Sequence, residues 1–424
     1  MRLVERHLIK STKPSYFELD KLSFLSKNLY NSVTYICRQA FFNGLAVPSF
    51  NQLYHQLKKG QDYKSLPAKV SQLVIKQVAR SFKSFFAAMA AYQQDKSKFL
   101  GKPRLPNYKH KISGRNLICY NYQAISKKLL KQGYINPSLT NIKIKTKQTS
   151  ICEVRIIPKN GCYLIEVVYE KDCIKDLDSV LDSPHNRANP ISLGNASQEK
   201  RVAGIDIGIS NLATVTSNKD DFRPFIVCGK AIKSTNQYFN KYKAKLQSLL
   251  PTGKYKSRRI DRLTIKRNNK VDYYLHTASR FIVNQLVSHQ ITDLIIGKND
   301  NWKQSVNLGA KTNQSFTSIP HAKFIDQLIY KCQLVGIKVH TVNESYTSKC
   351  SFLDLEPIKK HETYLGKRVH RGLFKSSSGK TYNCDINGSL NCIRKVVGDS
   401  LFKGKLIERL VVSPVRMKPY KAKS

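Results

Sequence analysis

The sequence contains few acidic residues for its length. Among 424 residues there are 28 Asp and Glu against 73 Lys and Arg, so the formal net charge is +45. Such an excess is far above the few net charges that solubility requires, and it makes a folded chain repel itself. Binding to a polyanion relieves this repulsion, because each contacted phosphate releases counterions. We therefore expect nucleic acid as a partner, in preference to a surface that is merely solvated.

Long apolar runs are also missing. No stretch approaches the roughly 20 apolar residues that cross a membrane, and no separate basic amphipathic tail stands out. The first residues, Met1 to Arg6, lack the apolar core of a signal peptide. We therefore expect a cytoplasmic protein, nucleoid-associated if the host is prokaryotic, with no membrane partner.

Paired cysteines are the third absence. The chain has ten cysteines but no CxxC pair. A structural zinc site needs four ligands, normally with such paired spacing. Scattered cysteines in a large chain without a secretion signal are typical of reduced, buried, small hydrophobic residues. The sequence therefore predicts no zinc.

What the chain does contain is enough apolar material for two or three folded domains, with 41% hydrophobic residues. Apolar residues recur at helical spacing within residues 16–109, which predicts a helical recognition lobe with a second long helix starting after Pro67. Residues 110–173 change to β-type runs, and Asn160-Gly161 between two of them predicts a hairpin. Together with a strand in residues 1–15, they are expected to form a small antiparallel sheet or β-barrel, the barrel being the wedge domain into which the lobe is inserted.

A change of composition marks the boundary to a second half. The strand pattern is broken in residues 174–200, which are predicted to be a linker, by Asp176, Asp178, Asp182, Pro184, Pro190 and Gly194. In residues 201–410 strands and helices follow one another, which predicts an α/β domain. The basic residues 411–424 are predicted to be a disordered tail.

A carboxylate stands inside an apolar run at Val202-Ala203-Gly204-Ile205-Asp206-Ile207-Gly208. A buried, unpaired carboxylate costs several kcal/mol, and a divalent cation would offset that cost. The two glycines beside Asp206 let a backbone or a phosphate come close. The alternative is a hairpin aspartate that is bonded to its local backbone.

The second candidate lies in Asn383-Cys384-Asp385-Ile386-Asn387-Gly388-Ser389-Leu390-Asn391. Asp385 begins a predicted helix, so it is either a metal ligand or a plain N-cap. Asn387 and Asn391 are four residues apart on one helix face. We interpret both as polar groups that meet a phosphate or a metal-bound water.

Two sets of basic residues are candidate nucleic-acid contacts. Arg258, Arg262, Lys266 and Lys270 recur every four residues on a long predicted helix, and their mutual repulsion would be relieved along an RNA or heteroduplex backbone. Lys102, Arg104 and Lys109 interleave with prolines and aromatics in an extended segment that suits a backbone clamp. The alternatives are a solvated helix face and an ordinary linker.

These motifs together resemble the TnpB family of transposon-encoded proteins, which is related to the Fanzor proteins and the type V CRISPR effectors. Ile205-Asp206-Ile207-Gly208 and the later Asp385-Ile386-Asn387-Gly388 resemble its first and third RuvC motifs. Further landmarks extend the resemblance over most of the chain: Leu29-Tyr30-Asn31, Lys98 to Lys109, Trp302-Lys303-Gln304 and Tyr346-Thr347-Ser348-Lys349.

The resemblance implies a fold, a chemistry and partners. It implies an RNase H-like (RuvC) nuclease domain that uses two Mg²⁺ or Mn²⁺ ions held by acidic side chains. It also implies a guide RNA from the transposon end that pairs with one strand of a double-stranded DNA target.

The chain departs from the family pattern at its second RuvC motif. Gly297 stands at the end of a predicted strand where the family commonly has Glu. Glu344 ends the next predicted strand, and adjacent strand ends lie ~4.8 Å apart, so its carboxylate is the expected replacement. The alternative is a surface Glu that caps a turn. Asp300, Asp354 and Glu356 are less favoured because they follow turn-like or loop-like residues.

A second departure concerns the zinc knuckle that relatives often carry before the last aspartate. Only Cys350 and Cys384 remain nearby, and two thiols do not make a tetrahedral site. We expect packing of Phe352, Leu353 and Phe374 to hold this loop instead.

The leading hypothesis is an RNA-guided, divalent-metal-dependent DNA endonuclease with Asp206, Glu344 and Asp385 as metal ligands and catalytic residues. The first alternative is an RNA-guided DNA-binding protein of the same fold that cannot cleave, because of Gly297. Further alternatives are a DNA transposase that acts in strand transfer and a basic RNA-binding structural protein.

Overall fold

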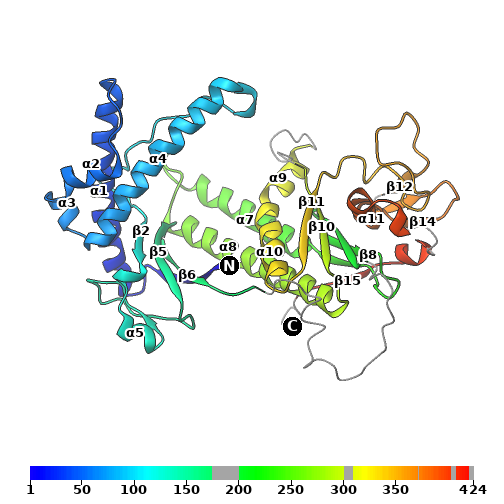
Figure 1. Cartoon of the computed structure of the whole chain (residues 1–424). Coiled ribbons are helices and arrows are strands. Elements are labelled where there is room, and N and C mark those ends of the chain that lie inside the picture. Colours follow the sequence, from blue (N-terminus) through cyan, green and yellow to red (C-terminus); the bar gives the residue numbers. More distant parts are fainter. Residues whose placement is uncertain (174–199, 300–308, 371, 403–406, 420–424) are drawn as a thin grey trace. The chain divides into compact units, whose positions relative to one another are not determined.

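The computed structural model describes residues 1–173, 200–299, 309–370, 372–402 and 407–419. The chain divides into two compact units, Met1–Lys171 and Asp172–Ser424 (Figure 1). The predicted linker, apart from Lys200, lies outside the described residues, as do the landmark at Trp302 and the candidate Asp300. No described helix is both long enough and apolar enough to cross a membrane.

The first unit combines helices with a four-stranded antiparallel sheet and a separate two-stranded one. Its long helices are α1 (Ser15–Phe42) and α4 (Ala68–Gln94), and α4 starts directly after Pro67, as predicted. The sheet has the order β1-β6-β5-β2, formed by β1 (Arg2–Lys10), β6 (Cys162–Glu170), β5 (Ile151–Lys159) and β2 (Ile118–Asn121). The shorter elements are α2 (Phe50–Leu57), α3 (Gln61–Lys64), α5 (Lys127–Lys131), β3 (Tyr134–Ile135) and β4 (Ile144–Lys145).

The predicted hairpin is present. Asn160 and Gly161 connect β5 to β6, and both have positive φ, 48° and 69°. This is the conformation that a two-residue hairpin turn requires and that Asn-Gly adopts at low cost. The N-terminal strand β1 pairs with β6 over its whole length, which confirms its predicted place in this sheet.

The sheet differs from the predicted barrel. The terminal strands β1 and β2 have no pairing with each other, so the four strands form an open sheet in the described residues. The helices and the sheet also share one hydrophobic core, in which Leu29 and Val78 of the helices join Ile118 and Ile165 of the strands. The helical residues 16–109 are therefore not a lobe with a separate core, because the helices cover the sheet.

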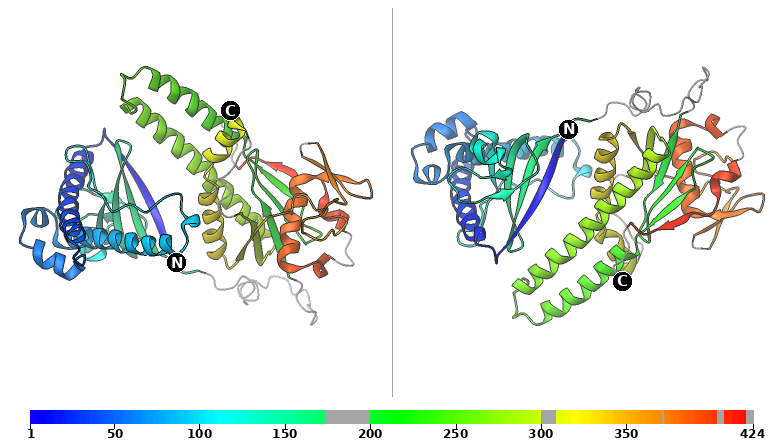
Figure 2. Two further views of the ribbon diagram at one scale, coloured as in Figure 1. Left: turned by 90° about the horizontal axis from the view of Figure 1, so that it is seen from above. Right: turned by 90° about the horizontal axis from the view of Figure 1, so that it is seen from below.

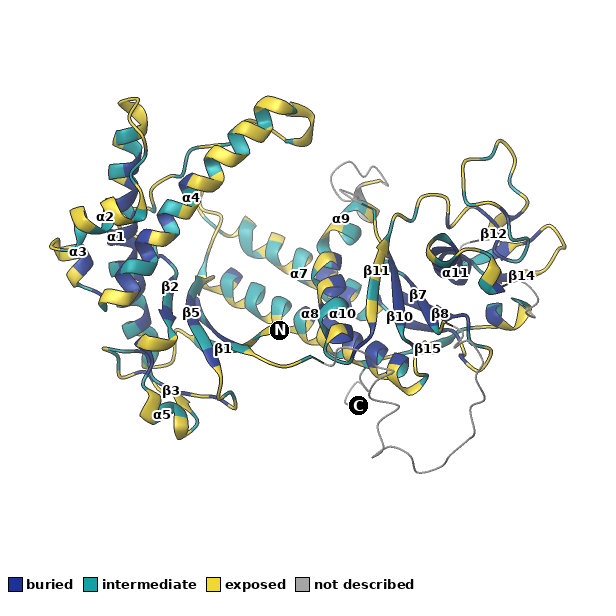
Figure 3. Ribbon diagram, in the orientation of Figure 1, coloured by how far each residue is buried: buried dark blue, intermediate teal, exposed yellow. Residues whose placement is uncertain are grey.

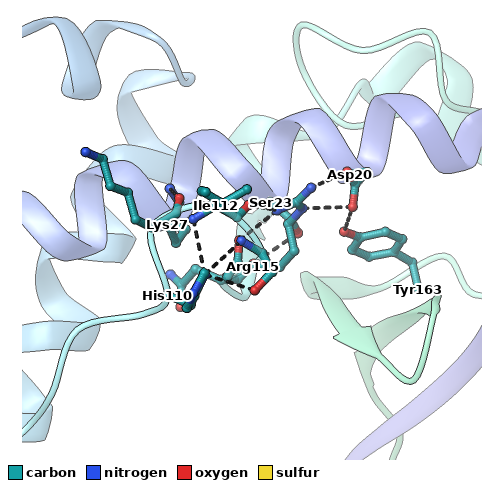
Figure 4. A network of polar contacts seen from close by, with 11 residues as sticks. Asp20, Ser23, Lys27, His110, Ile112, Arg115 and Tyr163 are labelled. Atoms are coloured by element: carbon teal, nitrogen blue, oxygen red, sulfur yellow. Dashed lines mark hydrogen bonds and ion pairs between the residues drawn. The ribbon is translucent and has the colours of Figure 1, made fainter. Parts of the chain in front are cut away.

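An ion pair fastens the chain just after the extended segment to this core. Arg115 donates two hydrogen bonds to the carboxylate of Asp20 on α1, and Tyr163 of β6 donates a third at 2.8 Å (Figure 4). The Arg115 guanidinium is the main reason why the pKa of Asp20 is lowered. Three separate parts of the chain thus meet at one carboxylate.

The second unit is a sheet with helices on both faces. Its strand order is β11-β10-β7-β8-β9-β15. The strands are β7 (Val202–Asp206), β8 (Asn211–Ser217), β9 (Phe225–Cys228), β10 (Asp293–Gly297), β11 (Lys338–Val342) and β15 (Val415–Met417). β7, β10 and β11 are parallel, whereas β8 is antiparallel to both of its neighbours. The predicted mixed α/β character is confirmed.

The helices of this unit are divided between the two faces of the sheet (Figure 2). One face packs against α8 (Arg258–Ser288) and α10 (His321–Gln333), and the other packs against α11 (Cys384–Val397). Strands β7, β8 and β10 are the buried centre (Figure 3). The remaining elements are α7 (Lys230–Ser248), α9 (Ala310–Ser318) and the three-stranded sheet of β12 (Lys367–His370), β13 (Leu373–Lys375) and β14 (Thr381–Asn383).

The predicted disordered tail is wrong for residues 415–417. These residues form β15, which pairs in parallel with β9 at the edge of the sheet. Val415 and Met417 pack against the core between the sheet and α8, so two apolar side chains hold a segment that composition alone marked as disordered.

Candidate functional site

Asp206 lies at the end of β7, on the sheet face that α11 covers. Alternation along β7 turns Ala203 and Ile205 toward the α8 core, so Gly204 and Asp206 face the opposite side. There α11 comes very close: a Cβ on Gly204 would lie 2.5 Å from the backbone oxygen of Ser389, and one on Gly388 would lie 3.1 Å from Oδ2 of Asp206. The lack of a side chain at Gly204 is therefore needed for α11 to pack this closely, and a side chain at Gly388 would crowd the Asp206 carboxylate.

The environment of Asp206 disfavours its charged form. Burial raises its pKa well above the usual range, and the carboxylates of Asp385 and Glu344 raise it further, while the Arg368 guanidinium opposes them. All three predicted acids are thus near enough to interact. Mutual repulsion of this kind is relieved when a cation binds between carboxylates.

Asp385 is not the N-cap of its helix. That role belongs to Asn383, whose Oδ1 accepts hydrogen bonds from the backbone N–H groups of Asp385 and Ile386. The carboxylate of Asp385 is therefore available for another role, and it accepts a hydrogen bond from Nδ2 of Asn211 at 2.5 Å. Sequence reasoning missed Asn211 as the residue that orients Asp385, although it belongs to the first motif.

Glu344 follows β11 and lies next to the end of β10. Gly297, the last residue of β10, pairs in register with Val342. A Cβ on Gly297 would lie 2.9 Å from Oε2 of Glu344 and 3.0 Å from Sγ of Cys392. The carboxylate of Glu344 thus occupies space into which a side chain at 297 would project. Burial raises the pKa of Glu344, and the Lys395 ammonium opposes that shift.

The donor chemistry of these three acids suits a hard divalent cation, because Mg²⁺ and Mn²⁺ prefer carboxylate oxygens. The side chains as they stand do not yet form a ligand group: among the described residues, no three His, Cys, Asp or Glu side chains are arranged to hold a metal ion. The structure thus brings the acids into electrostatic contact, and a metal would require them to draw closer.

The interpretation of Asn387 and Asn391 as nucleic-acid contacts is wrong. Both side chains are fully buried. Their Nδ2 groups donate to the backbone oxygens of Thr347 and Cys350 at 2.8–3.2 Å, and Oδ1 of Asn387 accepts from the backbone N–H of Phe352. The two asparagines instead fasten the loop at 347–352 to α11, because their shared helix face is turned toward protein.

A buried polar network continues from these asparagines. Arg394 donates to Oδ1 of Asn391 at 2.9 Å and to the backbone oxygen of Glu356 at 3.1 Å. The carboxylate of Glu356, itself buried, accepts from the backbone N–H groups of Ser351 and Leu365. This carboxylate organises a loop and is not directed at the acidic site.

The loop where relatives often carry a zinc knuckle is packed as expected. Phe352 is buried in the core beneath α11, Phe374 is buried in a small cluster with Tyr382, and Leu353 packs against both clusters. Cys350 and Cys384 are buried free thiols.

The basic face of α8 is exposed. Arg258, Arg262, Lys266 and Lys270 all lie at the surface, as the four-residue spacing predicts. No ion pair among the described residues involves any of the four. Their side chains are therefore open to a polyanion.

The extended segment is fixed to α1. Asn31 forms two hydrogen bonds of 2.9 Å with the backbone of Lys109, and Arg38 donates to the backbone oxygen of Pro106. Lys102 and Arg104 remain exposed, whereas Lys109 is half-buried with its ammonium over the Tyr30 ring. The segment is thus held in a defined path, which an ordinary linker would not need.

Sequence comparison places this chain among known proteins. Residues 180–303 match the family model "probable transposase" (OrfB_IS605), and residues 321–392 match the "Cas12f1-like, TNB domain" model. The curated "TnpB-like protein ORF457" of Acidianus two-tailed virus is 24% identical over 95% of this chain and 89% of its own length. The chain is thus similar to a TnpB-like protein over most of its length. The resemblance that the RuvC-type motifs indicated is confirmed.

Solved structures with distant likeness to this chain include CRISPR effectors. A Cas12f1–sgRNA–target DNA complex aligns over 92% of this chain and 98% of its own, with 12% identity and a TM-score of 0.36. CasPhi-2 (Cas12j) bound to crRNA and phosphorothioate DNA aligns over 96% and 92%, with 9% identity and a TM-score of 0.42. The likeness to the TnpB family is based on the sequence matches.

Proposed function

We propose that this protein is an RNA-guided DNA endonuclease of the TnpB family, with an RNase H-like, RuvC-type site made of Asp206, Glu344 and Asp385. The observation that carries the proposal concerns the second motif, where Gly297 stands in place of an acid and Glu344 lies beside it. The missing side chain at Gly297 leaves space, and the carboxylate of Glu344 enters it from the neighbouring strand. If the chain had simply lost its acid at position 297 together with catalysis, no second carboxylate would be expected beside that position.

The chain's own residues prepare this site. β7 and α11, packed against each other at glycines, bring Asp206 and the first turn of α11 together. Asn211 orients Asp385, and β11 delivers Glu344. Two bound Mg²⁺ or Mn²⁺ ions would supply an activated water and stabilise the leaving oxygen during phosphodiester hydrolysis.

The proposed nucleic-acid partners are based on the charge of the chain and on its likeness to the TnpB family. A net charge of +45 and the exposed basic face of α8 favour a guide RNA and a double-stranded DNA target as ligands. The guide RNA is proposed to derive from the transposon end. Base pairing would then read the sequence, while the protein reads duplex shape and a short flanking motif.

The test begins with the ribonucleoprotein, purified after co-expression of the chain with its flanking transposon DNA. The bound RNA is sequenced, and plasmids that carry matching targets beside a randomised flank are incubated with the complex in Mg²⁺. We expect cleavage that depends on the guide sequence and is lost in Asp206→Ala, Glu344→Gln and Asp385→Asn, each of which still binds RNA. Strand transfer without RNA would instead support a transposase.

A second candidate is an RNA-guided binder without cleavage. Gly297 favours it, and so does the fact that no described group of three acids already stands as a metal-ligand set. In this case the complex would bind matching DNA and give no product in Mg²⁺ or Mn²⁺ with any target.

A further inference from the structure

The carboxylate of Glu344 lies beyond the end of its strand, where the regular backbone hydrogen bonds stop. β11 ends at Val342, two residues earlier. A glutamate in such a turn has three side-chain torsions to fix before it can bind anything in a defined position. The contacts that fix Glu344 therefore decide whether its carboxylate is usable.

The backbone of this turn is held from α11. Nζ of Lys395 donates to the backbone oxygens of Asn343 and Ser345, both at 2.8 Å, so one ammonium grips the residues on either side of Glu344. The hydroxyl of Thr347 donates to the backbone oxygen of Glu344 at 2.8 Å. These bonds place the main chain but leave the carboxylate free to turn.

The carboxylate itself is held by Asn299. Nδ2 of Asn299 donates to Oε1 of Glu344 at 3.3 Å, and Oδ1 of Asn299 accepts from the backbone N–H of Glu344 at 3.1 Å. The same amide therefore hydrogen-bonds both the carboxylate and the backbone N–H of Glu344. Its donation occupies Oε1, while Oε2 lies on the side of Gly297 and Cys392.

An asparagine suits this position chemically. Its amide donates a hydrogen bond without bringing a charge, so it fixes one oxygen and does not itself compensate the negative charge of Glu344. A lysine or arginine here would compete with that cation, and an aspartate would repel the glutamate. Asn299 also follows β10 by two residues, so the strand that lacks an acid at Gly297 supplies the holder for the acid of the next strand.

We propose that Asn299 is a positioning residue that orients the Glu344 carboxylate for divalent-cation binding. This inference rests on the proposed role of Glu344 as a metal ligand. Residues of this kind, which hydrogen-bond a ligand without touching the metal, typically change metal affinity 10- to 100-fold when they are replaced.

The experiment measures Mn²⁺ binding to the full chain, free of nucleic acid, by electron paramagnetic resonance of unbound Mn²⁺. The variants are Asn299→Ala, Asn299→Asp, Glu344→Gln and the double variant Asn299→Ala with Glu344→Gln. Asp206→Ala identifies the binding that belongs to the site. Asn343→Ala is the matched control, because its Oδ1 accepts from the N–H of Ser345 in the same turn without contacting the Glu344 carboxylate.

We expect Asn299→Ala to weaken the Asp206-dependent binding about tenfold and to change it less than twofold when Glu344 is already Gln. Asn299→Asp, which has nearly the same shape and keeps the acceptor for the backbone N–H, should weaken it at least as much. Asn343→Ala should leave it unchanged. Circular dichroism and thermal unfolding establish that each variant is folded.

The outcomes separate the two proposals. If Glu344→Gln weakens binding but Asn299→Ala does not, or weakens it equally in both backgrounds, the role of Asn299 is overturned while the proposed site stands. Equal losses in Asn299→Ala and Asn343→Ala would show that Asn299 is only a turn residue. If the chain shows no Asp206-dependent Mn²⁺ binding, the metal site is overturned and the role of Asn299 with it.

Discussion

At the scale of single residues, the position that distinguishes this chain is Gly297. A Cβ there would lie 2.9 Å from Oε2 of Glu344, closer than real Cβ atoms come to another atom, and 3.0 Å from Sγ of Cys392, which is a tight contact. Gly297 is part of a buried strand, and the nearest atom that can yield is the end of the flexible Glu344 side chain. Glycine at 297 and glutamate at 344 are therefore coupled choices.

We predict that Gly297→Ala displaces the Glu344 carboxylate. The added methyl group should lower the free energy of unfolding by about 1–3 kcal/mol, as overpacking of a core does. It should also reduce Asp206-dependent Mn²⁺ binding and guided cleavage at least tenfold. Urea unfolding and the Mn²⁺ titration measure the two effects.

Gly101→Ala is the control for the stability measurement, because a Cβ there has no neighbour within 4 Å. Wild-type Mn²⁺ affinity in Gly297→Ala would contradict the coupling between positions 297 and 344.

Residue-scale prediction from the sequence could use a residue type that is out of place, but it had no access to the orientation of side chains. Asp206 could be found because a carboxylate in an apolar strand requires an explanation. Asn387 and Asn391 were assigned wrongly, because helical spacing shows which residues share a face but not what covers it. The loop that buries them is brought there by tertiary packing.

At the scale of secondary-structure elements, α8 presents two different faces. One face packs on the sheet and on α10, and the other carries the exposed residues Arg258, Arg262, Lys266 and Lys270. Periodicity predicted the basic face, since these four residues recur every four positions. It could not predict β15, whose three residues are too short to show a pattern.

We predict that the basic face of α8 contacts RNA or heteroduplex phosphates. Replacing all four residues with Ala should weaken binding of the co-purified RNA. It should also flatten the plot of log affinity against log salt by about one unit for each phosphate that the helix no longer neutralises. Filter binding between about 50 mM and 400 mM salt measures both.

The matched control removes the same charge elsewhere: Lys13, Lys21, Lys128 and Lys131 are exposed lysines of the first unit. If both quadruple variants change the slope equally, the effect reflects net charge and not this helix face.

The contact between α8 and α10 contains a buried lysine. Nζ of Lys331 on α10 donates to the backbone oxygen of His276 at 2.7 Å and to the hydroxyl of Ser279 at 2.6 Å, both on α8. Burial, with a smaller contribution from Arg280, lowers the pKa of Lys331 to about 8. An unfolded lysine titrates near 10.4.

We predict that the free energy of unfolding rises between about pH 8 and 10 because Lys331 loses its proton in the folded state. Below pH 8 both states hold the proton, and the folded state bears the cost of a buried charge. Between about pH 8 and 10 the folded state releases the proton while the unfolded state keeps it, so stability increases relative to pH 7. Lys331→Met should lack this increase.

Thermal unfolding of the chain at pH 7, 8, 9 and 10 measures the effect as the difference between wild type and Lys331→Met. A difference that stays constant over this range would show that Lys331 titrates normally in the folded protein.

At the scale of the whole molecule, each unit has its own core. The core of the first unit contains residues from Leu19 to Val167, all within Met1–Lys171. The cores of the second unit draw on Val202 to Leu410. The sequence located this boundary by its composition but divided the first unit into lobe and barrel, because helical and strand periodicity do not reveal that the two share one interior.

We therefore predict that the halves fold separately. Residues 1–173 bury Leu29, Val78 and Ile165 without help from the rest of the chain, so this fragment should unfold cooperatively in urea. Residues 200–424 contain all three acids with Asn211 and Asn299, so this fragment should keep Asp206-dependent Mn²⁺ binding within about threefold of the full chain, since separate domains behave additively. Circular dichroism, urea unfolding and the Mn²⁺ titration test both fragments.

A first fragment without a cooperative transition would show that its core needs the second unit. A folded second fragment without Mn²⁺ binding would show that the site depends on residues of the first.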